Sequence, residues 1–550
     1  MPPTAFSQLV DEWIDGTFAY RPGAATSYGI HEHDGDLGDR SRGIIEARAE
    51  ALRGFLRRLE LIDTEGLEPA EAPEYELLRR RLRWELIDSE DIASWRRSPA
   101  GYLGIIGGAC NGLIIRDFSP LPDRARSLVS RLRQAPALLE QARVNLDACP
   151  RIHVETAIEQ AAGLRLLLQR DLPTALAELD DSTLLAEFDG ANEDATAALD
   201  EFATWMKDDL LPRSDADFAY GPERFKQLLS CVDFIDRPLD ELRKRAKEDL
   251  RATQEQLREL AAQVDGSMTT AEVVDLISQD HPTPERLLPD TDALLEELRQ
   301  FAIDRRLATM PTDVRIRVAE TPTFARMTTF AACSTPGAFE TRATEAYYYV
   351  TPPDPSWPAE RTDLYLKFFN RYSLPGITAH EAYPGHYVHI SWLRKAERRL
   401  PHLIRATTTT EGWAHYVEQA FVEAGYGDGD PRYHIMQLRE ALLRLCRYLV
   451  SFGLHTSGWT FEQAVEFFQK EGFATQPIAE REARRGVIGP GYYAYTLGKH
   501  EILALRDKLK AKQGADFDLL AFHDDFMKLP YPISIIEGML LGGGEQAASN

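Results

Sequence analysis

The stretch TAHEAYPGHYVH, residues 378–389, decides how the second half of this chain is interpreted. It contains an adjacent pair, His380 and Glu381, and a further histidine, His386, six positions after the first. Histidines that share a metal ion on one helix are usually four residues apart, about 40° from alignment. Six steps of about 100° would leave the two imidazoles about 120° apart. Shared coordination therefore requires a break in the helix.

Pro384 and Gly385 lie between the two histidines and predict such a break. Pro384 has no N–H for the carbonyl of His380, and its ring would clash with that carbonyl. Gly385 tolerates dihedral angles that other residues avoid. We therefore expect the chain to bend here and to bring His386 back toward His380. His389, three residues after His386, is the rival ligand.

A third metal ligand is expected from TTTTEGWAHYVEQAF, residues 407–421. Catalytic zinc sites have three protein ligands and an open position for water, and Glu411 lies 25 residues after His386. The alternative is a capping box, Thr408-x-x-Glu411, in which the glutamate only satisfies backbone donors. His415, four residues after Glu411, is a candidate to orient a ligand.

Substrate-facing residues are expected in two tyrosine-rich stretches. Tyr495, in PGYYAYTLGKHEILALRD (490–507), can donate its hydroxyl to a developing oxyanion, although aromatic residues in a helix often serve packing alone. Tyr348, in the strand-like run AYYYV (346–350), can contact an extended peptide that pairs with the strand edge. A substrate carboxylate would need a basic anchor, and the candidates are Arg371, Arg485, Lys499 and Arg506.

Helical periodicity dominates the first 300 residues. Between 236 and 266, apolar residues recur at intervals that place them on one helix face: Leu239, Leu242, Ala246, Leu250, Leu257 and Leu260. Between about 312 and 351, apolar and polar residues alternate, which predicts a small sheet. We expect a mainly α-helical protein with this sheet next to the site helices. Without a low-complexity linker, residues 1–310, a helical part covering the cleft, and 311–550, the catalytic part, should form one continuous unit.

Composition argues against several partners. The formal charge of −24 and the pI near 5.1 disfavour nucleic acid. No run approaches the 18 or so apolar residues of a membrane helix. The start, MPPTAFSQLVDEWIDG, lacks a basic segment followed by an apolar one, so a cytoplasmic location is expected. The sequence does not indicate an oligomeric state.

The segments HEAYPGHY, EGWAHYVEQ and PGYYAYTLGKHEIL, together with RPGAATSYGIHEHDGDLGDRS near the start, resemble the bacterial family domain of unknown function 885. The resemblance covers nearly the whole chain. That family is grouped with zincin-type metallopeptidases and is similar in fold to the helical carboxypeptidase Taq family. The resemblance implies a large helical zincin-like fold, with His380, His386 and Glu411 as metal ligands and Glu381 as general base.

Three functions are compatible with these observations. The leading hypothesis is a gluzincin-like, zinc-dependent peptidase with one Zn²⁺ per chain that hydrolyses short peptides, and cleavage from the C-terminus is an analogy with the related fold. The second is a metal-dependent hydrolase of a non-peptide amide or ester. The third is a metal-free binding or scaffold protein with a decayed site. Two carboxylates beside two histidines argue against the third, because buried charges are costly without a compensating cation.

Overall fold

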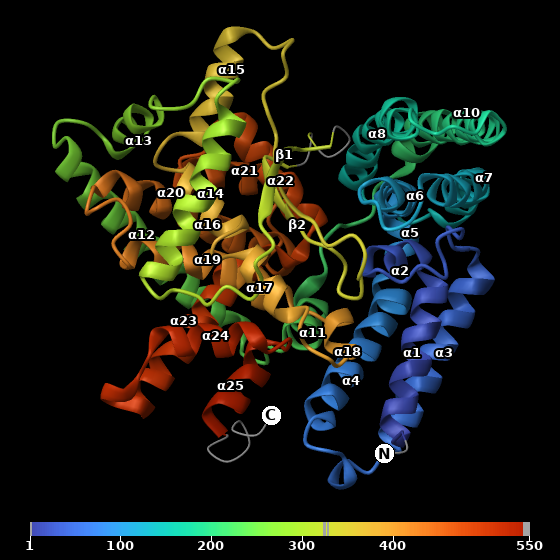
Figure 1. Cartoon of the computed structure of the whole chain (residues 1–550), viewed down its shortest axis with the longest axis horizontal. Helices are drawn as coiled ribbons and strands as arrows, with labels where there is room; N and C mark the ends of the chain where they lie inside the picture. The colour runs from blue at the N-terminus through green and yellow to red at the C-terminus, as the bar shows by residue number, and fades with distance from the viewer. Residues whose placement is uncertain (1–2, 323–325, 327–328, 543–550) are drawn as a thin grey trace. The chain divides into compact units, whose positions relative to one another are not determined.

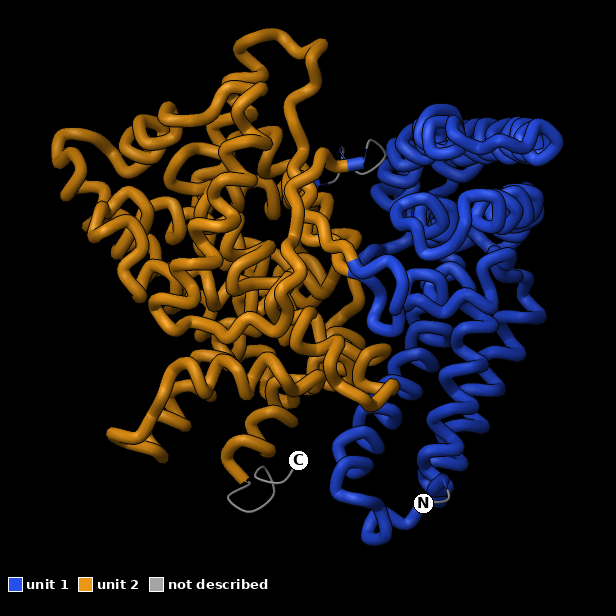
Figure 2. The backbone as a smooth tube through the Cα atoms, viewed as in Figure 1, with its two compact units in different colours: residues 1–218, 322–329, 336–344 blue, residues 219–321, 330–335, 345–550 orange. Residues whose placement is uncertain are grey.

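The computed structural model describes residues 3–322, 326 and 329–542. Their contacts divide the chain into two compact units (Figure 2). Unit 1 comprises Met1–Phe218, Pro322–Thr329 and Pro336–Thr344. Unit 2 comprises Ala219–Thr321, Phe330–Thr335 and Glu345–Asn550. The chain therefore leaves unit 2 and returns to it twice between the strands of its sheet.

Unit 1 is built from helices (Figure 1). Its centre is a cluster of buried apolar side chains from α6, α7, α8 and α10, and the long α7 packs against α10. Its helices are α1 (Ala5–Tyr20), α2 (Pro22–Tyr28), α3 (Arg42–Glu60), α4 (Glu71–Ile87), α5 (Ser94–Arg97), α6 (Pro99–Ile114), α7 (Leu121–Asn145), α8 (Arg151–Leu166), α9 (Leu172–Ala175) and α10 (Ser182–Trp205).

Unit 2 combines helices with a small sheet and carries all the site residues expected from the sequence. Its elements are α11 (Gly221–Asp233), α12 (Leu239–Val264), α13 (Thr270–Ser278), α14 (Leu287–Asp304), β1 (Ile316–Glu320), β2 (Ala331–Ser334), β3 (Ala346–Val350), α15 (Ala359–Leu366), α16 (Leu374–Glu381), α17 (His386–Leu393), α18 (Leu400–Leu403), α19 (Thr407–Glu423), α20 (Pro431–Thr456), α21 (Phe461–Gly472), α22 (Gln476–Ile488), α23 (Ala494–Gln513), α24 (Leu519–Lys528) and α25 (Ile533–Gly542).

The boundary between the units differs from the expected division at residue 310. The amphipathic stretch 236–266 forms α12, which packs its buried leucines along α20 of the site-bearing unit. The Tyr448 hydroxyl of α20 donates to the Leu242 carbonyl, 3.4 Å away. Residues 219–310 thus belong with the C-terminal half, because the apolar face of α12 is buried there. Periodicity showed that this face is buried but not against which helices.

The mainly helical fold and its small sheet are confirmed. The sheet has three strands among the described residues, in the order β1-β3-β2, with β1 parallel and β2 antiparallel to β3. Part of the expected β-rich segment, residues 323–325 and 327–328, lies outside the described residues.

One expectation for this sheet is wrong. AYYYV forms the central strand β3, whose two sides are already paired, so it has no free edge for a peptide. Tyr348 is 0% exposed, and its hydroxyl lies 3.4 Å from the hydroxyl of Thr378 on α16. Tyr348 therefore packs the sheet against the site helix and does not reach a substrate. Strand alternation places Tyr347 and Tyr349 on the opposite face, where their rings stack.

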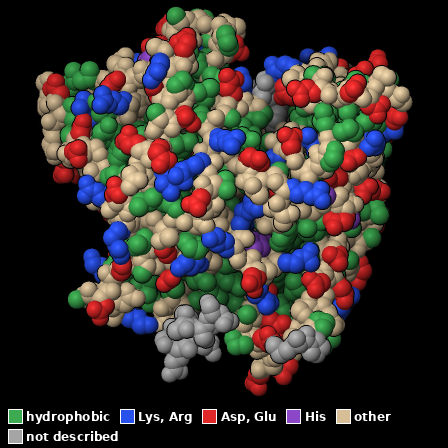
Figure 3. All heavy atoms as spheres, in the orientation of Figure 1, with side chains coloured by type: hydrophobic (Ala, Val, Ile, Leu, Met, Phe, Trp, Pro, Cys, Tyr) green, Lys and Arg blue, Asp and Glu red, His purple; other side chains and the backbone are tan. Residues whose placement is uncertain are grey.

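Acidic and basic side chains are interspersed over the face drawn in Figure 3. Within the described part of the chain, each helix is too short or too polar to cross a lipid bilayer.

Candidate metal centre

The expected break in the helix lies between the two histidines. Helix α16 ends at Glu381 and α17 begins at His386, so His380 lies in the last turn of one helix and His386 is the first residue of the next. Gly385 lets the chain pass over the end of α16: a Cβ there would lie 1.9 Å from the His380 carbonyl oxygen. The two imidazoles face each other nearly edge to face, with ring centroids 4.8 Å apart. A glycine is required because no side chain fits between the two helix ends.

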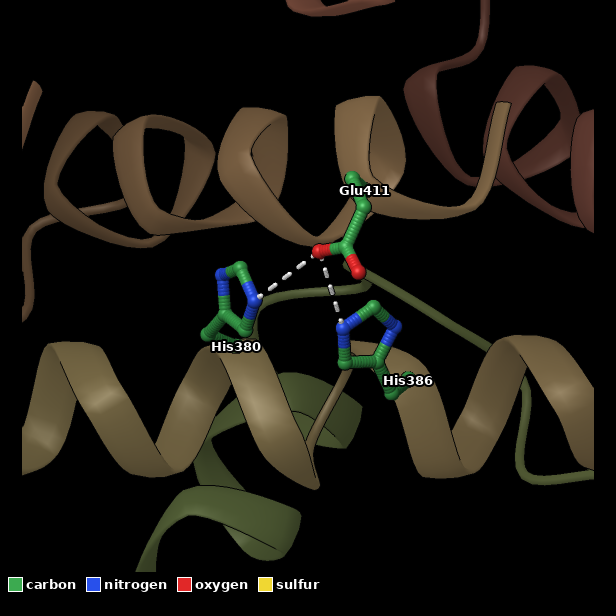
Figure 4. A group of neighbouring side chains, drawn as sticks. All are labelled: His380, His386 and Glu411. Atoms are coloured by element: carbon green, nitrogen blue, oxygen red, sulfur yellow. Dashed lines mark ion pairs between the residues drawn. The ribbon is translucent and has the colours of Figure 1, made fainter. Parts of the chain in front are cut away.

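Glu411 lies opposite both histidines, on α19 (Figure 4). One of its carboxylate oxygens, Oε2, is 3.6 Å from Nε2 of His380 and 3.4 Å from Nε2 of His386. The capping-box alternative does not hold, because the helix begins one residue before Thr408 and the Thr408 hydroxyl donates to Asp233.

These three side chains fit a metal ion. Their donor atoms all lie within 4.8 Å of one another. In a tetrahedral site with bonds of about 2.1 Å, neighbouring ligand atoms are about 3.4 Å apart, whereas an N–H···O hydrogen bond is about 2.9 Å long. The distances of 3.4 and 3.6 Å match ligands of a shared ion better than they match hydrogen bonds. Residues His380, His386 and Glu411 can therefore hold one ion.

Glu418, which the sequence analysis did not single out, supports this set. Its carboxylate lies 2.6 Å from Nδ1 of His380 and 2.9 Å from the Arg444 guanidinium. Burial would lower the pKa of His380, but the carboxylates of Glu411 and Glu418 raise it to about 9. Burial would likewise raise the pKa of Glu411, yet the two imidazoles hold it well below its usual range. Glu418 fixes the His380 ring so that Nε2 points at Glu411, as carboxylates behind metal-binding histidines do.

A signal for Glu418 was present in the sequence. It lies seven residues after Glu411, on the same face of α19. His415, between them, is 1% exposed and contacts Glu418 at 3.2 Å. Burial, together with the charge of Lys499, lowers the pKa of His415 to about 3. His415 therefore contacts the carboxylate behind the site and is separated from the three donor side chains by Glu418.

Glu381 is held at the sheet. Its Oε2 accepts a hydrogen bond from the backbone N–H of Cys333, 2.8 Å away on β2. Glu381 directly follows His380, so this contact fixes a second carboxylate beside the metal donors. The partner comes from a strand 48 residues earlier, which no local pattern could indicate.

Of the three tyrosines at 492, 493 and 495, Tyr495 is the one whose ring lies next to His380. Its ring is stacked 6.5 Å from that of His380. The other two hydroxyls are engaged elsewhere, that of Tyr492 with Glu482 and that of Tyr493 with Asp233. Burial and the charge of Glu411 raise the pKa of Tyr495, so its hydroxyl keeps its proton.

Close packing of α19 against α23 at two glycines brings Tyr495 next to His380 and Glu411. A Cβ on Gly412 of α19 would lie 2.5 Å from Cα of Gly498 on α23, and a Cβ on Gly498 would lie 1.9 Å from the Thr408 carbonyl oxygen. The two helices therefore touch backbone to backbone, which sets the start of α23 beside Glu411.

His389 does not join the donor group. It is 0% exposed and packs between Trp413 and Phe526, with ring centroids 5.9 and 6.1 Å away. Burial lowers its pKa to about 3, so it is neutral. The rival-ligand expectation fails because α17 begins at His386, and three further residues carry His389 to the side that faces α24.

The four basic candidates occupy different environments. Lys499 is buried, and burial lowers its pKa. Arg506 contacts Glu423 at 3.1 Å, and Arg371 lies 3.9 Å from Asp280. Of the four, Arg485 is the one whose guanidinium lies over the ring of Tyr492, three residues before Tyr495. Arg485 is therefore the candidate that contacts the tyrosine-rich start of α23.

Fold and site together define a mainly helical protein in which two histidines and a glutamate lie close enough to hold a metal ion. The chain belongs to the family described as "Bacterial protein of unknown function (DUF885)", which matches residues 22–538. None of the curated protein sequences is similar enough to match it.

Two solved structures share the fold. A "putative lipoprotein of unknown function" from Shewanella oneidensis has a TM-score of 0.82 and 25% identity, with 98% of this chain and 99% of that chain covered. A "putative lipoprotein" from Colwellia psychrerythraea has a TM-score of 0.83 and 17% identity, with the same shares covered.

Proposed function

We propose that this protein is a zincin-like, zinc-dependent metallopeptidase that hydrolyses short peptides. The observation that carries the proposal is the convergence of His380 and His386 on one oxygen of Glu411, at 3.6 and 3.4 Å, beside the anchored carboxylate of Glu381. A zinc ion held there would polarise the scissile carbonyl and lower the pKa of a bound water.

The residues around the donor group have the chemistry that amide hydrolysis needs. The Cys333 N–H holds Oε2 of Glu381, and this carboxylate would accept a proton from the attacking water and give it to the leaving amine. Tyr495 keeps its phenolic proton and can donate it in a hydrogen bond to the oxyanion. Glu418 keeps His380 oriented throughout.

The test measures zinc content and peptide hydrolysis in the same preparations. Wild type should carry about one zinc ion per chain after zinc is supplied, and His386→Ala and Glu411→Gln should lose it. Glu381→Gln should keep the zinc and lose hydrolysis, because it removes the proton acceptor and no metal donor. Glu423→Gln, on the same helix as Glu411, is the matched control and should behave like wild type.

Two outcomes would overturn the proposal in different ways. Zinc in wild type without cleavage in a peptide library, but with cleavage of an ester or a non-peptide amide, would favour the broader hydrolase. Wild type that binds no metal would favour a binding or scaffold protein. A cytoplasmic location stays a prediction, and cell fractionation tests it.

A further inference from the structure

Beside Tyr495, three arginines share one buried glutamate. Glu482 is 1% exposed and accepts hydrogen bonds from Arg447, at 2.6 and 3.2 Å, and from the Tyr492 hydroxyl. Arg485 and Arg481 lie farther from the same carboxylate, at 3.5 and 4.0 Å. One carboxylate balances only one of the three positive charges, and Arg447 makes the shortest contacts with it.

These two arginines are also the accessible ones. The Arg481 and Arg485 side chains are 42% and 44% exposed, whereas that of Arg447 is 12% exposed. They lie four residues apart on α22, so they project from one face of the helix. Each is braced by an aromatic ring, Arg481 by Phe330 at 4.4 Å and Arg485 by Tyr492 at 5.3 Å. A stacked guanidinium keeps its donors in a fixed plane, which suits bidentate binding of a carboxylate.

Strand β2 links Arg481 to the metal centre. Phe330, beneath Arg481, directly precedes β2, and Cys333 of the same strand donates to Glu381. Three residues of extended strand span roughly 10 Å. Arg481 and Glu381 therefore contact the same short stretch of chain, at Phe330 and at Cys333.

The start of α23 links Arg485 to the same place. Arg485 lies over Tyr492, and three residues later Tyr495 stacks near His380. The Tyr495 ring also lies 5.5 and 5.8 Å from the guanidinium carbons of Arg447 and Arg444. Arg444 and Arg447 belong to α20 and are paired with Glu418 and Glu482, so the guanidiniums on the exposed side of this group are those of Arg481 and Arg485.

We infer that Arg481 and Arg485 form the anchor for a carboxylate on the substrate, which makes the protein selective for peptides with a negative charge near the cleaved bond. The inference rests on the proposed peptidase function and adds the residues that choose the substrate. The carboxylate is either the free C-terminus, as in a carboxypeptidase, or an acidic side chain. Both sources offer the same two oxygens to the guanidiniums.

Three N-acetylated peptides of one core sequence separate these sources: a free acid, its C-terminal amide, and an amide with Asp as the last residue. We would measure kcat/KM for each with zinc-loaded wild type, Arg481→Gln, Arg485→Gln and the double variant. Wild type should prefer the free acid over the amide by about tenfold or more, and the preference should disappear in the double variant. Arg485→Lys should restore part of it, because it keeps the charge and loses the planar fork.

Arg258→Gln is the control for loss of a positive charge. Arg258 is 61% exposed on α12 and pairs with Glu255 of the same helix. It should leave the preference at the wild-type value. Circular dichroism and thermal melting would show that the α22 variants are folded. Preference for the Asp amide as well as the free acid would identify an anchor for any carboxylate, and preference for the free acid alone would identify the C-terminus.

Calorimetric binding of the same peptides to Glu381→Gln, with and without the α22 substitutions, separates this inference from the peptidase proposal. If wild type cleaves no peptide, but Glu381→Gln binds the acid more tightly than the amide and the α22 substitutions abolish the difference, the anchor stands and the peptidase proposal fails. Equal cleavage of all three peptides, a preference that survives in the double variant, or no binding of the free acid would overturn the anchor.

Discussion

Histidines and carboxylates meet in both units of this protein, but in opposite geometries. In unit 1, each ring nitrogen of His31 faces its own carboxylate, Asp34 at 3.0 Å and Glu340 at 3.1 Å, and the ring stacks on Phe118. In unit 2, two histidines face one oxygen of Glu411 at 3.6 and 3.4 Å.

The difference separates a hydrogen-bonded structural cluster from a group that could hold a metal ion. The His31 contacts have hydrogen-bond lengths and diverge from one ring, so they join the α2 region to the segment Pro336–Thr344 within unit 1. The contacts of Glu411 are longer and converge on one point, where a cation would satisfy all three side chains. Residue types alone would not distinguish the two clusters.

The largest expected effect comes from replacing one histidine in each cluster. His386→Ala should abolish stoichiometric zinc binding, whereas His31→Ala should leave about one zinc ion per chain and destabilise unit 1 by about 1 kcal/mol. Elemental analysis and chemical denaturation measure the two quantities. Loss of zinc in His31→Ala with the fold intact would contradict the distinction.

A second substitution tests the break between α16 and α17, which lets His380 and His386 face the same oxygen of Glu411. Gly385→Ala should destabilise the metal-free protein by at least about 3 kcal/mol and lose zinc, because its Cβ would lie 1.9 Å from the His380 carbonyl oxygen. Gly376→Ala, on α16, is the control, since nothing lies within 4 Å of its Cβ position. Thermal melting with and without zinc checks both, and a Gly385→Ala protein that melts like wild type would show that the break can relax.

The stability of the metal-free protein should depend on pH through His380, which belongs to the unit 2 cluster. Burial disfavours protonation of His380, but Glu411 and Glu418 raise its pKa from 6.5 to about 9. A raised pKa contributes stability that is complete below pH 6.5 and is lost as the pH rises through 9. Wild type without metal should therefore lose a few kcal/mol over this window relative to His380→Gln.

Urea denaturation between pH 6 and 9.5 in the presence of a chelator measures this loss. Zinc needs the neutral imidazole, so added zinc should stabilise the protein more as the pH rises through the same window. Parallel stability curves for wild type and His380→Gln would show that the carboxylates do not hold a proton on His380.

The smallest effect concerns the carboxylate behind the site. Glu418→Gln should weaken zinc affinity by about 10- to 100-fold without abolishing binding, because it loosens His380 but removes no donor. Glu423→Gln, one turn beyond on α19, should leave the affinity unchanged. Competition with a chromogenic chelator gives both values, and equal affinities for the two variants would remove Glu418 from the metal centre.

Local sequence rules determined much of this protein. Apolar periodicity indicated a helical body, alternation indicated a small sheet, and Pro384 with Gly385 indicated the break before His386. These features follow from steric and hydrogen-bonding constraints that act within a few residues, so they can be recognised from the chain alone.

Only the tertiary structure decided which side chains converge. It buried Tyr348 in the central strand, turned His389 toward Trp413, placed Glu418 behind His380 and set Arg481 at the start of β2. Each placement joins elements that are distant in sequence, and close approaches such as Gly412 against Gly498 set their distance. Local patterns show that a helix face is buried, but the partner it meets depends on how all the elements pack together.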